Sequence, residues 1–245
     1  RQLGLSILMH DAAHGLLHTN RRINNFLGQW LTGAATGVDL QAYRTYHLVH
    51  HRYTQQPEDP DLSLSKPFPT SKASMARKVA RDLTGIVFLR QRYAQLVMAL
   101  KSFGPGVKEQ NIFIGKAFAR FMGVQLVLLV LSLIFYGWTP FLLWIIALAT
   151  TFQLFLRVRN IAEHACTTTG SEDPFTHART TLANWAERAT VAPYWVNYHS
   201  EHHLFMGVPC YNLPHAHRLL GKGGYHPRMT IAPDYLSVLR QVVTA

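Results

Sequence analysis

The longest uncharged run in the chain limits its possible folds more than any other feature. From Phe121 to Leu156 there are 36 residues without a charged side chain. A single helix of this length would measure about 54 Å, whereas the hydrocarbon core of a bilayer is about 30 Å thick. The turn signal Tyr136-Gly137-Trp138-Thr139-Pro140 lies in the middle of the run. The run therefore predicts a transmembrane hairpin of two helices, over 116–137 and 139–158, and a buried hairpin in a soluble core is the less favoured alternative.

Charged residues flank the uncharged run but are missing from its centre. Lys116 and Arg120 precede it, and Arg157 and Arg159 follow it, while the central turn carries no charge. By the positive-inside rule, both outer ends of the hairpin lie in the cytoplasm. We therefore expect an integral membrane protein whose active site lies on the cytoplasmic face. The compact chain without a fused haem domain is compatible with a bacterial inner membrane.

The net charge of +11 is concentrated in one stretch. Between Lys66 and Arg120 there are 11 Lys or Arg residues against only Asp82 and Glu109, which gives this stretch a charge of +9. A nucleic-acid-binding protein would carry such charge within a recognisable binding motif, and the sequence contains none. Nucleic acid is therefore not an expected partner. A basic stretch that leads into an apolar run is instead typical of a membrane surface that faces anionic lipid.

The rest of the chain predicts further helices and no second domain. Residues 23–38 are apolar but short and contain three glycines, which favours a re-entrant or interfacial helix. Residues 40–115 and 159–245 are expected to be cytosolic and mostly helical. The sequence thus predicts one all-α domain over residues 1–245, with a membrane hairpin under a helical cap. Because the chain begins at Arg1 rather than Met, we expect its natural N-terminus to lie upstream.

Three histidine clusters are the strongest chemical signal among the 14 histidines of the chain. Two have the pattern His-x-x-His-His, and one has the pattern His-x-x-x-His. Residues i, i+3 and i+4 share one face of a helix, so their imidazoles can converge on a metal ion. Imidazole binds Zn, Fe, Cu and Ni, and the spacing does not choose among them. The clusters consist of His10 and His14, of His47, His50 and His51, and of His199, His202 and His203.

Exposed helical histidines are the alternative explanation for any single cluster. The first cluster also resembles the His-Glu-x-x-His zinc peptidase motif, but Asp11 stands where the glutamate base would be. Three clusters in a chain with an apolar hairpin favour a shared metal site instead. A hairpin returns the chain to the side that it left, so the second and third clusters lie on the same side of the bilayer. The first cluster joins them provided that residues 23–38 do not span it.

At these residues the chain resembles the membrane fatty acid desaturase superfamily, whose hallmark is three histidine boxes in this order. The resemblance extends from His10 to about Leu220 and includes Asp59-Pro60-Asp61 after the second box. It also includes residues 197–205 around the third box. The family fold implies a mostly helical cap over membrane helices, with two iron ions between them. It further implies a membrane hairpin before the first box, of which only residues 1–9 fall within this sequence.

The resemblance implies further residues around the two iron ions. The family's ligand set includes one more histidine on the helix that leaves the last span, and His164 fits that place. Asn160, one turn earlier, is implied to act through a water molecule. The acids Asp11, Glu163 and Glu201 stand beside ligand positions and are candidates for orienting imidazole N–H groups, although salt bridges would explain them equally well.

The remaining histidines and the two cysteines have simpler explanations. Two cysteines do not make a disulfide framework, and packing accounts for both. The five other histidines are expected on polar helix faces or in hydrogen bonds rather than as metal ligands. These residues are Cys166, Cys210, His18, His177, His215, His217 and His226.

The chemistry implied by the resemblance is O₂-dependent desaturation of a fatty acyl lipid or acyl thioester. Removing hydrogen from an unactivated CH₂ group requires an oxidant stronger than any side chain, which the metal supplies. Two electrons have to come from outside, because the sequence shows no ferredoxin-like cysteine set, flavin motif or haem domain. A separate ferredoxin or b-type cytochrome is therefore implied. The basic stretch from Lys66 to Arg120 offers such an acidic donor a docking face, although attraction to the lipid surface explains it equally well.

Three other functions stay open at this point. The same scaffold can act as a lipid hydroxylase or carotenoid ketolase, which only analysis of the product separates from a desaturase. A non-enzymatic membrane metal-binding protein would carry a histidine-rich loop or charges inside its spans, and the hairpin lacks such charges. A zinc hydrolase would use about three ligands and an acidic base, whereas nine candidate ligands are present here.

Overall fold

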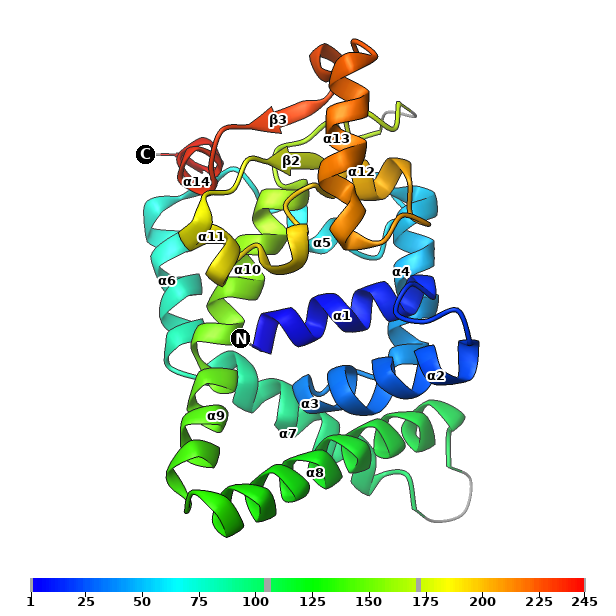
Figure 1. The fold of residues 1–245 in the computed structure, drawn as a ribbon. Coiled ribbons are helices and arrows are strands. Elements are labelled where there is room, and N and C mark those ends of the chain that lie inside the picture. The colour runs from blue at the N-terminus through cyan, green and yellow to red at the C-terminus, as the bar shows by residue number, and fades with distance from the viewer. Residues whose placement is uncertain (1, 104–106, 171–172, 245) are drawn as a thin grey trace.

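The computed structural model describes residues 2–103, 107–170 and 173–244. They form a mostly helical structure, which confirms the predicted fold class (Figure 1). The strands are two short parallel pairs, β1 with β4 and β2 with β3. In chain order the strands are β1 (Thr70–Ser71), β2 (Arg179–Thr181), β3 (Thr230–Ala232) and β4 (Val243–Thr244).

The α-helices carry most of the structure, and four short segments (η) are π-helical or 3₁₀-helical. In chain order they are α1 (Gln2–His14), α2 (Arg21–Phe26), η1 (Leu27–Gly33), α3 (Ala34–Thr36), α4 (Leu40–Tyr53), α5 (Leu62–Ser65), α6 (Lys72–Leu83), α7 (Ile86–Leu100), α8 (Glu109–Phe135), α9 (Thr139–Ala149), α10 (Thr151–His164), α11 (Trp185–Thr190), η2 (Pro193–Trp195), α12 (His199–Leu204), η3 (Cys210–Asn212), α13 (Leu213–Lys222), η4 (His226–Arg228) and α14 (Tyr235–Val242).

Helix α1 lies across the middle of the molecule (Figure 1). Helices α10 and α4 run past its two ends, α12 and α13 lie above it, and α2 with α3 lies below it. Helices α8 and α9 form the lower end, and α14 with β2 and β3 belongs to the upper end. The histidine-bearing helices α1, α4, α10 and α12 therefore surround one central region.

The uncharged run forms two long helical segments that meet at the predicted turn. Helix α8 begins at Glu109, seven residues before the predicted start, and α9 follows after Tyr136-Gly137-Trp138. Helices α9 and α10 together form the second segment, which ends at His164. They are separated by one irregular residue, Thr150, with φ −120° and ψ −85°. Both segments are long and apolar enough to cross a membrane. Only 17% of the residues in each apolar window are buried, which is low for a core helix.

Two arginines at the ends of the uncharged run tie the long helices to the rest of the molecule. Arg120 of α8 pairs with Asp39, whose carboxylate also caps α4 by accepting hydrogen bonds from two of its backbone N–H groups. Arg157 of α10 pairs with the fully buried Asp82 of α6, with an Nη2–Oδ1 distance of 2.9 Å. The two arginines nearest the run therefore also have structural partners.

The segment predicted as a re-entrant or interfacial helix is a bent helix made of α2, η1 and α3. It packs along α1 rather than away from it. Gly28 makes this close approach possible, because a Cβ atom there would lie 2.3 Å from the Cβ of Ala12. Phe26, Trp30 and Leu31 are exposed on the other side, so this helix also presents an apolar face outward.

Substituting Gly28 tests this close packing. Gly28→Ala should force η1 away from α1 and lower the free energy of unfolding by about 1–3 kcal/mol, the usual cost of overpacking. Gly123→Ala in α8 is the matched control, because a Cβ there meets nothing within 4 Å. The control should be neutral or stabilising by about 0.5–1 kcal/mol, since alanine favours helix. Thermal unfolding in one detergent measures both, and equal melting temperatures for the two variants would contradict the packing.

Candidate metal centre

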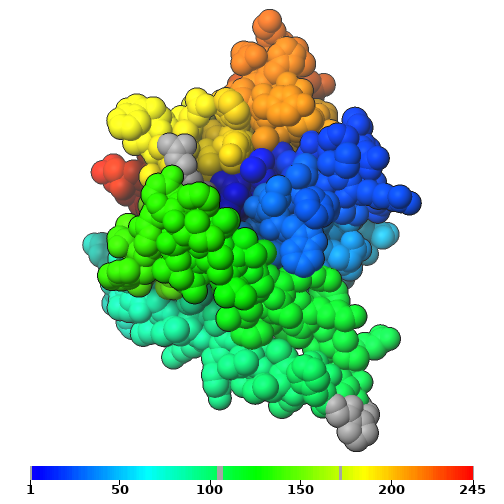
Figure 2. Space-filling model, turned by 60° about the horizontal axis from the view of Figure 1, so that its bottom comes forward, coloured from blue at the N-terminus to red at the C-terminus, as the bar shows by residue number. Residues whose placement is uncertain are grey.

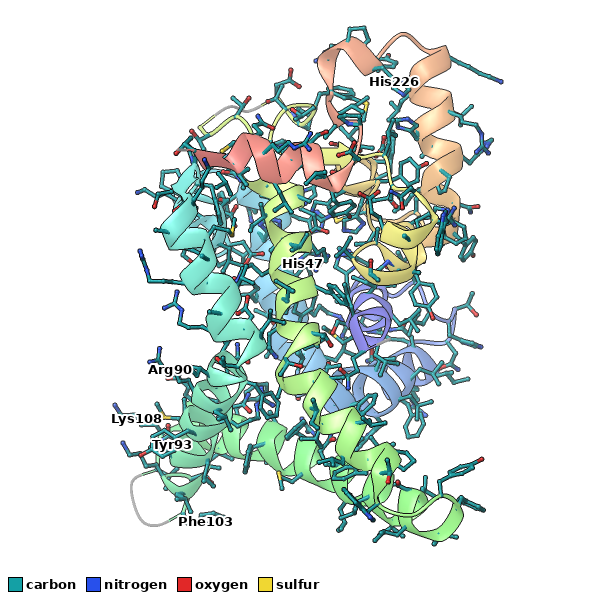
Figure 3. All side chains as sticks on the ribbon, turned by 90° about the vertical axis from the view of Figure 1, so that its left-hand side faces the viewer. His47, Arg90, Tyr93, Phe103, Lys108 and His226 are labelled. Carbon is teal, nitrogen blue, oxygen red and sulfur yellow. The ribbon has the colours of Figure 1, made fainter. Side chains whose placement is uncertain are left out.

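Four helices deliver nine imidazoles to the central region. Helices α1 and α4 and the last residue of α10 contribute from below and beside it, and the short helix α12 contributes from above. The i, i+3 and i+4 spacing within α1, α4 and α12 puts the rings of each helix on one face. Figure 3 shows His47 in the interior among these elements. The nine residues are His10, His14, His47, His50, His51, His164, His199, His202 and His203.

Helix α1 is fixed to α4 through its C-terminal carbonyl groups. The buried Arg44 of α4 donates from Nε to the carbonyl of Ala13 at 2.8 Å and from Nη2 to that of Ala12 at 2.9 Å. Asn24 donates to the same Ala12 carbonyl at 2.9 Å. A cation at a helix C-terminus satisfies carbonyls that the helix leaves free. Arg44 thereby holds the histidines of α1 against those of α4.

Strand β2 joins the end of α10 to α12. The buried Arg179 donates to the carbonyls of Ala162 and Ala165, at 2.9 and 2.7 Å. One residue before the strand, the carbonyl of Ala178 accepts a 2.7 Å hydrogen bond from the hydroxyl of Ser200 in α12. These contacts fix His164 relative to the third histidine cluster.

The nine imidazoles form two separate groups. Within each group, the candidate ligand atoms all lie within 4.8 Å of one another. In the first, which we call the five-histidine group, Nε2 of His51 lies 3.0 Å from Nε2 of His47 and 3.0 Å from that of His202. In the second, the four-histidine group, Nε2 of His164 lies 3.2 Å from that of His50 and 2.9 Å from that of His199. The five-histidine group consists of His10, His14, His47, His51 and His202, and the four-histidine group of His50, His164, His199 and His203.

The spacing of these nitrogens fits a metal ion in each group. Two ligands at right angles on bonds of about 2.1 Å are about 3.0 Å apart, which is the separation seen between neighbouring Nε2 atoms. Nε2 of His10 and of His14 are buried and have no hydrogen-bond partner among the described residues. Buried polar atoms normally have a partner. A metal ion would be a partner for these two nitrogens. The residues present therefore fit the metal ions that the sequence predicted.

Burial keeps the imidazoles in the form that binds metal. It lowers the pKa of His10, His47, His199, His202 and His203 well below the ordinary value, and neighbouring imidazoles add to the effect. Burial also lowers the pKa of His14 to about 4 and that of His51 to about 2. These rings are therefore neutral at pH 7, as metal ligands have to be.

Several ligand candidates have a hydrogen-bond partner for Nδ1, which leaves Nε2 free for the metal. His50 contacts the carboxylate of Asp59 at 2.8 Å, His164 contacts the carbonyl of His177 at 3.1 Å, and His203 contacts the hydroxyl of Thr54 at 3.2 Å. The sequence indicated Asp59 only as part of a family motif, and its contact with His50 was not predicted. Its position directly after the second histidine cluster was the available signal.

The three acids proposed to orient imidazoles have different surroundings. Asp11 lies 3.3 Å from Nδ1 of His10. Glu163 lies 3.4 Å from Nδ1 of His199 and also pairs with Arg159 at 2.6 Å. Among the described residues, the fully buried Glu201 makes no hydrogen bond or ion pair with a histidine of either group. It accepts hydrogen bonds from Thr180 and from His217, the latter at 2.6 Å. Its contacts join α12 to β2 and α13 instead.

Asn160 lines a cavity of about 180 Å³ beside the four-histidine group. Tyr43, Tyr46 and Leu156 contribute to the lining, and His50, His164 and His199 reach it from the metal site. Asn160 therefore faces the space next to this group, where a water molecule can lie between it and the metal. Its role as a water-mediated ligand stays a prediction.

The other histidines and both cysteines lie outside the two groups. His177 donates from Nδ1 to the carbonyl of Thr54 at 3.1 Å and helps to position the end of α4. His217 bonds Glu201, and His226 lies 3.0 Å from the carbonyl of His217. Figure 3 shows His226 at the upper end of the molecule, away from His47 in the middle.

The fold and the site define a helical protein with two adjacent histidine groups suited to metal ions and with two long apolar helices. The chain belongs to the fatty acid desaturase family, whose family model matches residues 1–232. This result confirms the resemblance that the three histidine boxes predicted.

Two relatives of this chain differ in the reaction that their names describe. The chain is 26% identical to the dihydrorhizobitoxine desaturase of Bradyrhizobium elkanii over 228 residues, which cover 89% of this chain and 64% of that protein. It is 39% identical to the zeaxanthin 4-ketolase of Chlamydomonas reinhardtii over 66 residues, which cover 26% of this chain and 15% of that protein. The chain thus spans less than two thirds of either relative. Family membership and the desaturase relative support an oxidoreductase.

The lowered pKa values predict how the metal-free protein responds to acid. The pKa of His14 and His51 is lower in the folded protein than the value of about 6.5 in an unfolded chain, so below that pH the unfolded chain binds more protons. The contribution of these two histidines to the free energy of unfolding should therefore be constant above about pH 6.5 and fall as the pH drops below it. The slope is at most about 1.4 kcal/mol per pH unit for each histidine.

Denaturant unfolding of the metal-free protein between pH 8 and pH 5 measures this slope. His14→Ala should reduce it, whereas His215→Ala, which removes an exposed histidine outside both groups, should leave it unchanged. A slope that His14→Ala leaves unchanged would show that this imidazole is not buried as the structure has it.

Proposed function

We propose that this protein is a membrane di-iron oxidoreductase that introduces a double bond into a fatty acyl chain with O₂ and two external electrons. The observation that supports this most directly is the convergence of nine imidazoles in two adjacent groups, in a chain of the fatty acid desaturase family. The overall reaction removes one hydrogen from each of two adjacent carbons. Together with two electrons and two protons from outside, it reduces O₂ to two molecules of water.

Iron is the metal that this chemistry favours. Imidazole ligands suit several divalent metals, but reduction of O₂ requires ions that change oxidation state, and zinc does not. We assign five ligands to one iron and four to the other, by the two histidine groups. Bound there, the two irons would supply the oxidant for C–H cleavage.

The protein's own contribution is to hold the imidazoles neutral, exclude bulk water and place the substrate. Most of the nine histidines are buried, and the lining of the cavity beside the four-histidine group includes Tyr43, Leu64 and Leu156. Tyr43 stacks on His47 with ring centroids 5.0 Å apart, which limits the movement of that imidazole. We propose that this cavity admits the reacting carbons of an acyl lipid or acyl thioester.

A membrane location is supported by the outer surface of the long helices. Figure 2 turns the lower end of the molecule forward, where α8 and α9, in green, form much of the visible surface. The exposed side chains there are large and apolar, and the two helices are joined by an uncharged turn. We propose that α8 and the combined α9–α10 cross the bilayer and that the histidine groups lie at its cytoplasmic face, in a bacterial inner membrane. The exposed apolar residues on this surface include Met122, Leu126, Val130, Leu133, Leu143 and Ile146.

Electrons are proposed to come from a separate ferredoxin or b-type cytochrome. The basic stretch from Lys66 to Arg120 includes the cations of α6 and, further along the chain, Arg90 and Lys108. These two parts are proposed to have different partners. Arg90 and Lys108 lie at the lower edge, away from His47 and beside the exposed Tyr93 and Phe103 (Figure 3). Cations next to exposed aromatic rings are typical of the lipid headgroup region. We therefore assign this part to anionic lipid and the cations of α6 to the donor.

A second candidate function is oxygen insertion by the same site, as in a ketolase or hydroxylase. The observation that favours it is the 39% identity to a named ketolase over 66 residues, higher than the identity to the desaturase over a longer segment. Both reactions require the same metal ligands. They differ in whether oxygen from O₂ stays in the organic product.

Expression of the protein in a bacterial host, with mass spectrometry of fatty acids and carotenoid-type lipids, tests the proposal. A new species lighter by two hydrogens indicates desaturation, and a product labelled by ¹⁸O₂ indicates oxygen insertion. His202→Ala should abolish either product, because it removes an imidazole of the five-histidine group. His215→Ala is the matched control and should retain it. A lipid profile that the wild-type protein leaves unchanged in the presence of iron and a competent donor would contradict the proposal.

A further inference from the structure

Asp59 makes the shortest acid–imidazole contact with a histidine of the two groups among the described residues. Its Oδ1 lies 2.8 Å from Nδ1 of His50, and both side chains are almost fully buried. The corresponding contacts are 3.3 Å for Asp11 with His10 and 3.4 Å for Glu163 with His199. The contact is therefore short and shielded from water, which strengthens a hydrogen bond to a charged group.

The turn after α4 holds the Asp59 carboxylate in this position. Its two oxygens accept hydrogen bonds from the backbone N–H groups of Gln55 and Asp61, each at 2.8 Å. Gln55 has a φ of +61°, a left-handed conformation that costs free energy in a residue other than glycine. The Gln55 side chain donates to the carbonyl of His164 at 3.0 Å, which links the turn to α10. A strained turn thus presents one carboxylate to one imidazole.

The two histidine groups differ in the partners of their Nδ1 atoms. The four-histidine group has Asp59 at His50 and Glu163 near His199, whereas Glu163 is shared with Arg159 and partly neutralised. The five-histidine group has Asp11 at the longer distance of 3.3 Å. Among the described residues, each group also contains one buried Nδ1 without a hydrogen-bond partner, that of His51 in the five-histidine group and that of His199 in the four-histidine group. The group with one imidazole fewer therefore has the stronger carboxylate contact.

We propose that Asp59 is a positioning residue that compensates the four-histidine group for its smaller number of imidazoles. A carboxylate that accepts the Nδ1–H of His50 orients the ring and makes its Nε2 more basic, so that this nitrogen binds a metal ion more strongly. The inference rests on the metal binding in the proposed function. It adds that the affinities of the two groups are set separately and that Asp59 controls only one of them.

Cobalt titration of the full chain tests the inference, because the visible absorption of Co²⁺ reports imidazole binding. The metal-free protein in detergent is titrated with Co²⁺ alone. His164→Ala identifies the binding step of the four-histidine group, and His14→Ala identifies that of the five-histidine group. Asp59→Asn should weaken the first step about 10- to 100-fold and leave the second unchanged.

Asp61→Asn is the matched control. Its carboxylate is in the same turn but lies 3.8 Å from Nδ1 of His50 and bonds Tyr46 instead. It should leave both binding steps unchanged. A purely structural role for Asp59 is tested in the His50→Ala background, where Asp59→Asn should cause no further loss of affinity if it acts through His50. A further loss there would overturn the inference.

A second measurement does not depend on whether Asp59→Asn folds. Wild-type protein loaded with Co²⁺ should show a paramagnetically shifted Nδ1–H proton resonance that exchanges slowly with water and disappears in His50→Ala. Fast exchange of that proton would overturn the inference. Wild-type protein that binds two Co²⁺ ions with an unchanged Asp59→Asn titration contradicts the role of Asp59 alone. Wild-type protein that binds no Co²⁺ contradicts the proposed function as well.

Discussion

The structure depends on the gathering of nine imidazole rings in a largely buried space. Nε2 atoms of seven of these rings lie 2.9 to 3.2 Å from a neighbouring Nε2, where two lone pairs repel unless something lies between them. Burial lowers the pKa of His10, His47 and His202, so protonation of these rings does not relieve the repulsion. A cation in each group would turn this unfavourable arrangement into a stabilising one. Much of the surrounding structure is explained by the need to hold the rings together.

The elements around the site act mainly as braces for the histidine-bearing helices. Arg44 fastens the end of α1 to α4, and Arg179 fastens the end of α10 to β2. Both arginines donate hydrogen bonds to backbone carbonyls and not to carboxylates. They therefore fix the helix ends and do not pair with the acids beside the imidazoles. Asp59 and Glu163 add charge at single rings instead. The long apolar helices lie below these braces and keep a large apolar surface free.

The sequence predicted the parts of the site that depend on local spacing. The i, i+3 and i+4 patterns identified eight of the nine grouped histidines, because helix geometry alone brings them to one face. His164 has no such local pattern, and only the resemblance to a family indicated it. Asp59 and Arg179 were not predicted to contact the site, because each reaches it through a turn or strand that no periodicity describes. The start of α8 was placed at residue 116 because charges mark the edge of an apolar run, whereas hydrogen bonding continues the helix back to Glu109.

Metal analysis of the purified protein combined with iron K-edge X-ray absorption is the most direct test of the metal centre. We expect two irons per chain, each surrounded mainly by imidazole nitrogens at about 2.1 Å. His202→Ala should reduce the iron content without removing all of it, because the four-histidine group keeps its ligands. Protein that is folded yet contains no iron after expression with ample iron, or that holds a single zinc ion, would contradict the assignment of two redox-active ions to the nine histidines.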